Sequence, residues 1–249
     1  MKKRLIRKAA LPLLLAGAWA LAVLVVGAQS QPLEGREVDL VWSTSDGQRM
    51  EIYYAHRLNG VWAEPVRITD DYYDNMYPVI DRDSTGTRWL FWTAYSNGRM
   101  ELRYTSGRDG TWRESTTLAD RMKTNISPSV VIDKEDTVWV AWSANDGGVD
   151  DIYVAFKDKN SWSEPAMPHA PNDVPDILPE VGLEDSGNPE VTWQSLQNGA
   201  LLTLTSRFSG EQWSEPEVSE NSEPVESHSE TLELPAFVNN TSMVFVRVY

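Results

Sequence analysis

The chain has 249 residues and a formal net charge of −15 at neutral pH, from 22 lysines and arginines against 37 acidic residues. A surface this acidic repels phosphate backbones, which argues against a nucleic-acid partner. The sequence contains no cysteine, and this excludes disulfides, thiolate metal sites and a catalytic thiol. The length allows one or two domains.

The N-terminal segment has the pattern of an export signal. Residues 1–10 carry five basic side chains and no acid, and Leu11 to Ala28 is an uncharged apolar run that ends in the small residues Gly27 and Ala28. We expect residues 1–28 to be a cleaved signal peptide or an uncleaved signal anchor. Both alternatives place the rest of the chain outside the cytoplasmic membrane, secreted or extracytoplasmic in the periplasm or at the cell surface. Only an uncleaved segment would contact the membrane.

A repeat of about fifty residues organises the remaining chain. Eight of the eleven tryptophans fall into two ladders with spacings of 50, 50 and 51 residues: Trp42, Trp92, Trp142 and Trp193, and then Trp62, Trp112, Trp162 and Trp213. A proline stands fourteen residues before the first tryptophan of repeats two to four, at Pro78, Pro128 and Pro179. A period of this length is typical of a propeller or a solenoid.

Each repeat reads as four short antiparallel strands, called a to d. In the third repeat they are Pro128–Asp133, residues 138–143, Asp150–Phe156 and residues 161–167. Asn-Gly and Asp-Gly pairs suited to tight hairpins separate the strands, at Asp46-Gly47, Asn59-Gly60, Asn97-Gly98, Asp109-Gly110 and Asn198-Gly199. No segment after residue 28 shows a helical period. The pattern predicts an all-β chain folded as a β-propeller with one blade per repeat.

The fourth strand of a repeat is expected to lie at the outer edge of its blade. Glu64-Pro65, Glu164-Pro165 and Glu215-Pro216 each put a charge and a residue without an N–H on that strand. Proline is tolerated where no ladder hydrogen bond is needed, and charge protects an exposed edge. We interpret the ladder tryptophans as packing between blades rather than as a platform for a ligand.

The number of repeats leaves the closure of the ring open. The predicted blades are about 38–68, 77–118, 127–167 and 178–218, with a partial blade at 232–249. No strand a precedes Val38, while Leu232–Val238 reads as an additional strand a and Met243–Tyr249 as an additional strand b. These four and a half repeats either close irregularly as a small, five-bladed ring or form an open arc that needs a second copy.

The repeat units resemble a known family. The stretch "IYYAHRLNGVWAEPVRITDD…YPVIDRDSTGTRWLFWTA" is similar to bacterial sialidase-like propellers built from BNR (Asp-box) repeats, over about residues 38–249. The Asp-box runs Ser-x-Asp-x-Gly-x-x-Trp, and Ser106-Gly-Arg-Asp109-Gly110-Thr-Trp112 matches it with one residue fewer. The resemblance implies an arginine triad on a substrate carboxylate, a tyrosine nucleophile paired with glutamate, and an acidic proton donor. Only Arg49 and Arg99 are in register here, so we transfer no catalytic residue.

Candidate binding residues lie in the loops from strand d to strand a and from b to c, which share one face of a propeller. One d–a loop combines carboxylates for sugar hydroxyls with rings for sugar faces, at Asp70, Asp71, Tyr72, Tyr73 and Asp74. Three residues before each strand-a proline stand Asn75, Asn125 and Asp176, which we expect near the rim of the channel. The candidate ligand-binding set consists of these eight residues with Arg49 and Arg99. The alternatives are a solvated acidic loop and ordinary turn capping.

The sequence predicts no cofactor and no metal site. Ca²⁺ is the alternative, through hard oxygen ligands in either of two acidic groups: Asp70, Asp71 and Asp74, or Asp146, Asp150 and Asp151. Neither group has EF-hand spacing. The three histidines, His56, His169 and His228, are scattered, and His169 reads as a loop residue among prolines.

Three functional hypotheses follow. The first is an exported, non-catalytic propeller that binds a glycan or an extracellular or envelope protein through its loop face. The second, which rests only on the family resemblance, is a divergent exo-alpha-sialidase or related glycoside hydrolase. The third is a structural propeller that completes its ring as a homo-oligomer.

Overall fold

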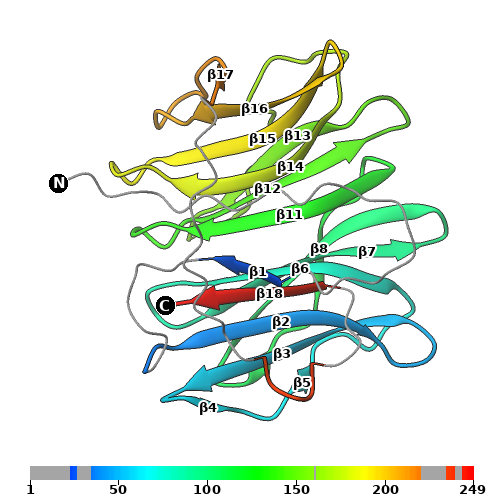
Figure 1. Cartoon of the computed structure of the whole chain (residues 1–249), viewed down its shortest axis with the longest axis vertical. Helices are drawn as coiled ribbons and strands as arrows, with labels where there is room; N and C mark the ends of the chain where they lie inside the picture. The colour runs from blue at the N-terminus through cyan, green and yellow to red at the C-terminus, as the bar shows by residue number, and fades with distance from the viewer. Residues whose placement is uncertain (1–22, 27–34, 160, 220–233, 239–242) are drawn as a thin grey trace.

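The computed structural model describes residues 23–26, 35–159, 161–219, 234–238 and 243–249, and all regular structure in these residues is β (Figure 1). The strands form four blades that follow one another along the longest axis of the molecule (Figure 1), and all pairs of these strands are antiparallel except one in the first blade. The chain is therefore all-β and of the propeller class, as the fifty-residue period predicts.

The elements are as follows. The first blade contains β2 (Val38–Ser45), β3 (Met50–Leu58), β4 (Val61–Trp62), β5 (Val66–Arg67), β18 (Met243–Val248) and β1 (Val23–Val26). The second contains β6 (Asp74–Arg82), β7 (Arg88–Ser96), β8 (Arg99–Arg108), β9 (Thr111–Trp112) and β10 (Thr116–Ala119). The third contains β11 (Thr124–Ile132), β12 (Val138–Asn145) and β13 (Asp151–Lys157). The fourth contains β14 (Asp176–Leu183), β15 (Pro189–Gln197), β16 (Ala200–Arg207) and β17 (Glu217–Val218).

The Asn-Gly and Asp-Gly pairs form the tight hairpins that the sequence predicts. Asn97 and Gly98 between β7 and β8 have φ values of 52° and 76°, and the other such pairs, at residues 59–60, 109–110 and 198–199, have closely similar values. Positive φ at both central residues defines a type I′ turn, whose twist matches that of the flanking strands. Asp46-Gly47 is the exception, because Asp46 N donates to Arg49 O at 3.0 Å and closes a longer turn.

A β-bulge accommodates the proline in the inner strand of the second, third and fourth blades. The register of β11 against β12 shifts between Ile126 and Ser129, and Ser127, just before Pro128, has a φ of 53°. The same shift recurs around Pro78 in β6 and Pro179 in β14. Because proline donates no ladder hydrogen bond, the bulge lets it lie inside a paired strand.

The predicted position of the fourth strand at the outer edge of its blade is confirmed. β4 and β5 pair only with β3, and the segment Ala63–Pro65 interrupts the outer strand between them. In the third blade the corresponding strand is reduced to two isolated bridges, Lys157–Trp162 and Val154–Ala166. A short, broken, charged edge offers little template for pairing with another chain.

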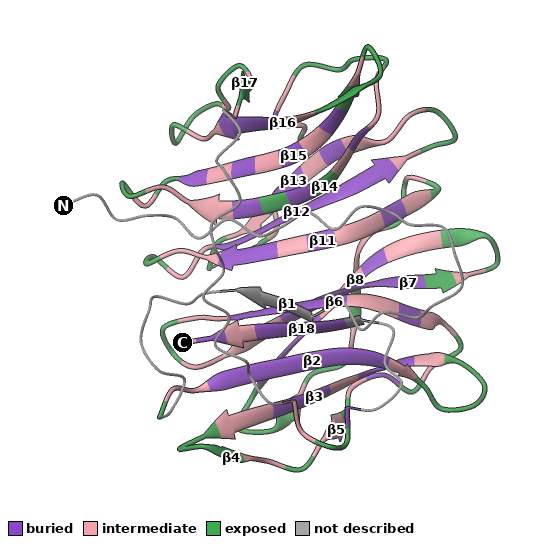
Figure 2. Ribbon diagram, in the orientation of Figure 1, coloured by how far each residue is buried: buried purple, intermediate pink, exposed green. Residues whose placement is uncertain are grey.

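Tryptophan packing between blades is also confirmed. The first ladder, Trp42, Trp92, Trp142 and Trp193, is at most 2% exposed. The second ladder packs against the preceding blade: the ring centroids of Trp112 and Tyr54 are 5.1 Å apart, and those of Trp162 and Tyr104 are 5.3 Å apart. Figure 2 shows the buried positions along the middles of the strands and the exposed ones at the hairpin tips.

The expected partial fifth blade is wrong in its strand assignment. Met243–Val248 pairs antiparallel with β2 across the register Val246–Leu40, and so takes the strand-a position of the first blade rather than position b of a further one. Leu234–Val238, the described part of the predicted additional strand a, is not a strand. The inward side chains of β18 complete the apolar core around Leu40, which is why the C-terminal strand supplies what the N-terminal repeat lacks.

The blades, as far as the described strands show, form an open arc rather than a ring. β6 packs on the first blade, β11 on the second and β14 on the third. Among the described strands, none of the fourth blade packs extensively on the first, and the two blades lie at opposite ends of the molecule (Figure 1). The five-bladed alternative is thus replaced by four blades in an arc.

The predicted signal segment lies outside the described residues except for Val23–Val26, which form β1 and pair in parallel with β18. Within the described part of the chain, no helix is long and apolar enough to cross a membrane.

Candidate functional site

The predicted site residues gather at one end of the blades. β6 begins at Asp74, which pairs with Tyr95 at the end of β7, so d–a loops and b–c turns share this end. Met50 N, just after a b–c turn, donates to Asp74 Oδ1 at 3.0 Å and joins the first blade to the loop before β6. Because strands a and b are antiparallel, the loop that enters strand a and the turn that leaves strand b lie at the same end of each blade.

Two tyrosines form a stacked pair in the loop that precedes β6. The rings of Tyr72 and Tyr73 have centroids 4.5 Å apart with an interplanar angle of 26°, and their hydroxyl oxygens are 3.1 Å apart. Tyr72 is 63% exposed, and Tyr73 is half-buried against the core. The guanidinium of Arg103 on β8 lies 5.0 Å from the ring centroid of Tyr73. The hydrogen bond to Tyr72, followed by burial, raises the pKa of Tyr73 to about 12.

The carboxylates of this loop hold the loop itself together. Asp71 Oδ1 accepts from Tyr73 N at 3.0 Å and from Asn75 Nδ2 at 2.9 Å. Asp70, which is largely exposed, pairs with Arg67 at 3.0 Å. With Asp74 bound to the first blade, the three carboxylates point to separate partners, and they do not form the Ca²⁺ ligand group considered from the sequence.

Asn75 and Asn125 are buried caps for tryptophans, which differs from the expected place at the channel rim. Asn75 Oδ1 accepts from Trp92 Nε1 at 2.7 Å, and Asn125 Oδ1 accepts from Trp142 Nε1 at 3.1 Å. Both asparagines are at most 1% exposed. A buried indole N–H needs an acceptor, and these side chains supply it.

The two arginines in register do not converge on a common ligand. Arg99 donates to the carbonyl oxygens of Asp120 at 2.6 Å and Met122 at 3.3 Å, in the d–a loop of its own blade. Arg49 is exposed in the b–c turn of the first blade. Their contacts give no support for an arginine pair acting on one carboxylate.

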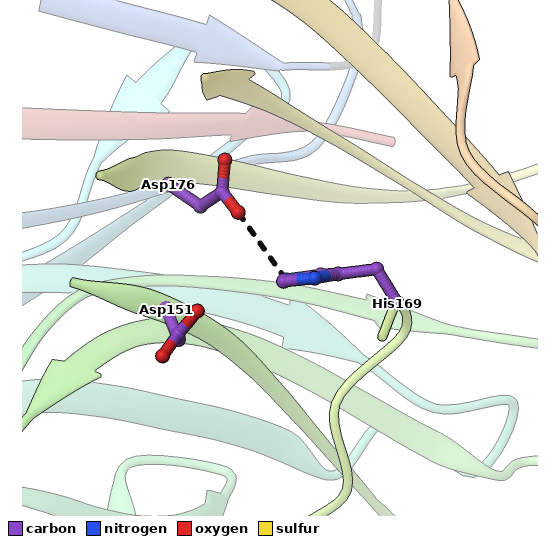
Figure 3. A group of neighbouring side chains, drawn as sticks. All are labelled: Asp151, His169 and Asp176. Atoms are coloured by element: carbon purple, nitrogen blue, oxygen red, sulfur yellow. Dashed lines mark ion pairs between the residues drawn. The ribbon is translucent and has the colours of Figure 1, made fainter. Parts of the chain in front are cut away.

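A third feature of this end is a largely buried cluster that the sequence patterns do not predict. Asp151, His169 and Asp176 come from β13, the following d–a loop and β14, and their potential ligand atoms all lie within 4.8 Å of one another. Figure 3 shows the imidazole projecting from its loop toward the two carboxylates. His169 Nε2 lies 3.6 Å from Asp176 Oδ2, and these two side chains are 2% and 0% exposed. Burial raises the pKa of Asp151, and the neighbouring Asp176 and Asp150 add to this, while His169 opposes it.

Comparing equivalent positions of the repeat would have pointed to this cluster. Asp151 follows Glu51 and Glu101 at intervals of 50, and His169 follows Thr69 and Ala119 at the same intervals. Asp150 belongs to the second acidic group that was a candidate for Ca²⁺. Its side chain does not join the cluster, because Asp150 Oδ1 accepts from Asn145 Nδ2 at 2.5 Å.

Comparisons with known proteins show the fold. No protein-family model matches the sequence, and no curated protein matches it. The structure is similar to an ulvan lyase of polysaccharide lyase family PL25, with a TM-score of 0.54 and 13% identity over 73% of this chain and 55% of the lyase. The chain therefore spans about half the length of that enzyme.

Two further solved structures are similar. A protein of unknown function from Dyadobacter fermentans has a TM-score of 0.51 and 10% identity, over 74% of this chain and 70% of that one. The NanB sialidase from Streptococcus pneumoniae has a TM-score of 0.47 and 13% identity, over 65% of this chain and 26% of the sialidase. At these identities the similarity to the ulvan lyase and to the Dyadobacter protein supports the propeller class and does not establish an activity.

Proposed function

We propose that this protein is a glycan-binding β-propeller module whose ligand docks on the tyrosine pair, Tyr72 and Tyr73, in the loop that precedes β6. The observation that carries the proposal is the stacking of Tyr72, 63% exposed, on Tyr73. An exposed aromatic face next to hydrogen-bond acceptors suits a sugar, whose C–H face is apolar and whose hydroxyls donate.

The pair is held in place before any ligand arrives. Arg103 covers Tyr73, and Asp71 accepts from the main chain of Tyr73 and from the side chain of Asn75. A ring that is already ordered loses little conformational entropy on binding, so contact with it contributes more to affinity.

Charge selects the class of glycan. Asp70, which is exposed and pairs with Arg67, stands two residues before Tyr72, and the whole chain has a net charge of −15. Anionic sugars would be repelled at low ionic strength. We therefore expect neutral glycans to bind better than sialosides or uronates. The ulvan lyase similar in fold was solved bound to -[GlcA(1-4)Rha3S]-, which supports a glycan as the class of partner. That ligand is anionic, so the preference for neutral glycans rests on the charge of this chain alone.

A glycan array followed by titration calorimetry tests the proposal. Tyr72→Ala should reduce affinity for the bound glycans about fivefold, since stacking on an aromatic ring contributes on the order of 1 kcal/mol. Val61→Ala is the matched control, because Val61 is 70% exposed at the opposite end of the first blade. An array without any bound glycan, or unchanged affinity of Tyr72→Ala, would overturn the proposal.

The same protein should release no chromogenic group from sialosides. We propose a binding role because Arg99 is engaged with main-chain carbonyls and no arginine triad is in register. Turnover by purified protein that is abolished in Arg99→Ala would instead establish the glycoside hydrolase alternative.

We further propose that the chain acts outside the cytoplasmic membrane, on the basis of the basic and apolar pattern of residues 1–28. Cell fractionation with N-terminal sequencing tests this. A cytoplasmic product with an intact N-terminus would contradict it.

A further inference from the structure

We propose that Asp151, His169 and Asp176 form a binding site for a divalent transition-metal ion such as Zn²⁺. The three side chains come from β13, the loop before β14 and β14 (Figure 3), so a bound ion would tie the fourth blade to the third. This proposal does not depend on glycan binding, because it concerns different side chains.

The geometry of the group suits a small cation. One imidazole nitrogen and two carboxylates are ligands typical of Zn²⁺, whereas Ca²⁺ takes six or more oxygens. Tetrahedral bonds of about 2.1 Å separate ligand atoms by about 3.4 Å, close to the 3.6 Å between His169 Nε2 and Asp176 Oδ2. All three ligand atoms lie within 4.8 Å of one another, so small side-chain rotations bring Asp151 into the same coordination shell.

The cluster contains polar atoms that nothing in the described part of the chain satisfies. His169 Nε2, Asp176 Oδ1 and Asp151 Oδ1 are buried there without a hydrogen-bond partner. An unsatisfied buried polar group costs about 1–3 kcal/mol, and buried groups are normally paired. Each of the three neighbouring side chains thus carries one unsatisfied buried atom, and one potential ligand atom of each lies within 4.8 Å of the others. This grouping indicates a missing ligand rather than three separate losses.

The imidazole is held in the tautomer that a metal requires. His169 Nδ1 is 2.8 Å from the carbonyl oxygen of Ala170, which can only accept, so Nδ1 is the donor and, in the neutral imidazole, Nε2 presents its lone pair. The ring also stacks on Trp193 with centroids 5.1 Å apart. Asn172 Nδ2 donates to Asp176 Oδ2 at 2.8 Å and orients that carboxylate. Such outer contacts are typical of metal ligands.

The other blade junctions carry different side chains at the same three phases. Between the first and second blades they are Glu51, Thr69 and Asn75, and between the second and third they are Glu101, Ala119 and Asn125. There Asn75 and Asn125 accept from the ladder tryptophans. At the third junction Asp176 faces the cluster instead, and Trp193 Nε1 has no hydrogen-bond partner among the described residues. If the third junction served only to pack the two blades together, we would expect it to keep an asparagine that accepts a hydrogen bond from the tryptophan, as the other two junctions do.

The test uses the full chain stripped of metal with chelator. Titration calorimetry and elemental analysis should show one Zn²⁺ per chain, and Co²⁺ should give a visible absorption spectrum of a nitrogen- and oxygen-ligated ion. His169→Ala should weaken Zn²⁺ binding by at least about 100-fold, since loss even of an outer contact costs 10–100-fold. His56→Ala is the matched control for adventitious binding by a histidine, because His56 lies on β3 of the first blade.

Asp176→Asn is a second variant, chosen so that a loss of Zn²⁺ binding does not result from misfolding. Asparagine occupies the equivalent position in two other blades and accepts a hydrogen bond from the tryptophan there. This variant should fold at least as well as the wild type in chelator, with a Tm that Zn²⁺ no longer raises. Equal Zn²⁺ affinity in wild type and His169→Ala, no stoichiometric ion, or tighter binding of Ca²⁺ than of Zn²⁺ would each overturn the proposal.

Discussion

Single polar side chains in the interior connect the blades. Asn125 is 1% exposed and, besides accepting from Trp142, donates through Nδ2 to Met100 O at 2.9 Å and Met122 O at 3.3 Å. It thus joins the d–a loop, the start of β8 and the tryptophan of the next strand. Local turn capping explains only part of this role, because the tryptophan is seventeen residues away.

Asn125→Ala should destabilise the protein by about 3 kcal/mol, because it leaves a buried indole N–H without its acceptor and two carbonyls without a donor. Urea unfolding measures the change in the free energy of unfolding. The exposed Asn188→Ala is the control and should stay within about 0.5 kcal/mol of wild type. Equal effects of the two substitutions would show that Asn125 is not a structural cap.

Glu51 gives a pH dependence of known sign. Its side chain is 1% exposed, accepts from Thr69 Oγ1 and pairs with Arg67 at 2.9 Å. Burial raises the pKa of Glu51, and the hydrogen bonds from Thr69 and Arg67 oppose the rise. A raised folded-state pKa contributes stability that is present below the ordinary carboxyl pKa and lost as pH rises through the folded-state value.

Wild type should therefore lose stability relative to Glu51→Gln as the pH rises from acid to neutral, because glutamine does not titrate. Urea unfolding of both proteins at several pH values measures the difference. A difference that stays constant, or that changes in favour of wild type with rising pH, would show that the pKa of Glu51 is not raised.

At the scale of elements, β18 is the decisive strand. It pairs with β2 over six residues, and Val244 and Val246 are fully buried in the core of the first blade. Arg247 on the same strand pairs with Asp81 of β6 at 2.5 Å and so ties the closing strand to the second blade. The C-terminus thereby stabilises the N-terminal blade.

Val246→Ala should destabilise the protein by about 2 kcal/mol, through lost apolar burial and the cavity left behind. The same change at Val218, which is 59% exposed on β17, should have an effect below about 0.5 kcal/mol. Chemical unfolding followed by tryptophan fluorescence measures both. Similar effects at the two valines would contradict the docking of β18.

At the scale of the whole molecule, the arc makes the blades unequal. The second blade has a neighbour on each side, whereas the fourth packs only on the third among the described strands. In stacked repeat architectures stability is close to a sum of unit and interface contributions, so a terminal unit with one interface opens more easily.

Hydrogen exchange should therefore be faster in β15 of the fourth blade than in β7 of the second, although the two strands occupy the same position in their repeats. Exchange detected by mass spectrometry of the peptides 189–197 and 88–96 measures this difference. Equal protection would indicate that the fourth blade gains a second interface, as a closed or oligomeric ring would supply.

The sequence by itself determined the features that depend on neighbours along the chain. Trp42 and its ladder partners gave the period, Asn97-Gly98 and similar pairs the turns, and Glu64-Pro65 the outer edge. Each follows from local chemistry: a conformation with positive φ, a residue without an N–H, or an apolar side chain at a regular interval. These rules identify the propeller class before any long-range contact is known.

The tertiary structure decided what depends on contacts between distant residues. It placed β18 beside β2, turned Asn75 and Asn125 inward as tryptophan caps, and brought His169 to Asp151 and Asp176. Strand patterns do not state which edge a strand joins, since backbone hydrogen bonds are the same at every edge. Loop composition likewise does not state where a histidine points, because burial between two blades, and not the prolines around it, sets the direction of the ring.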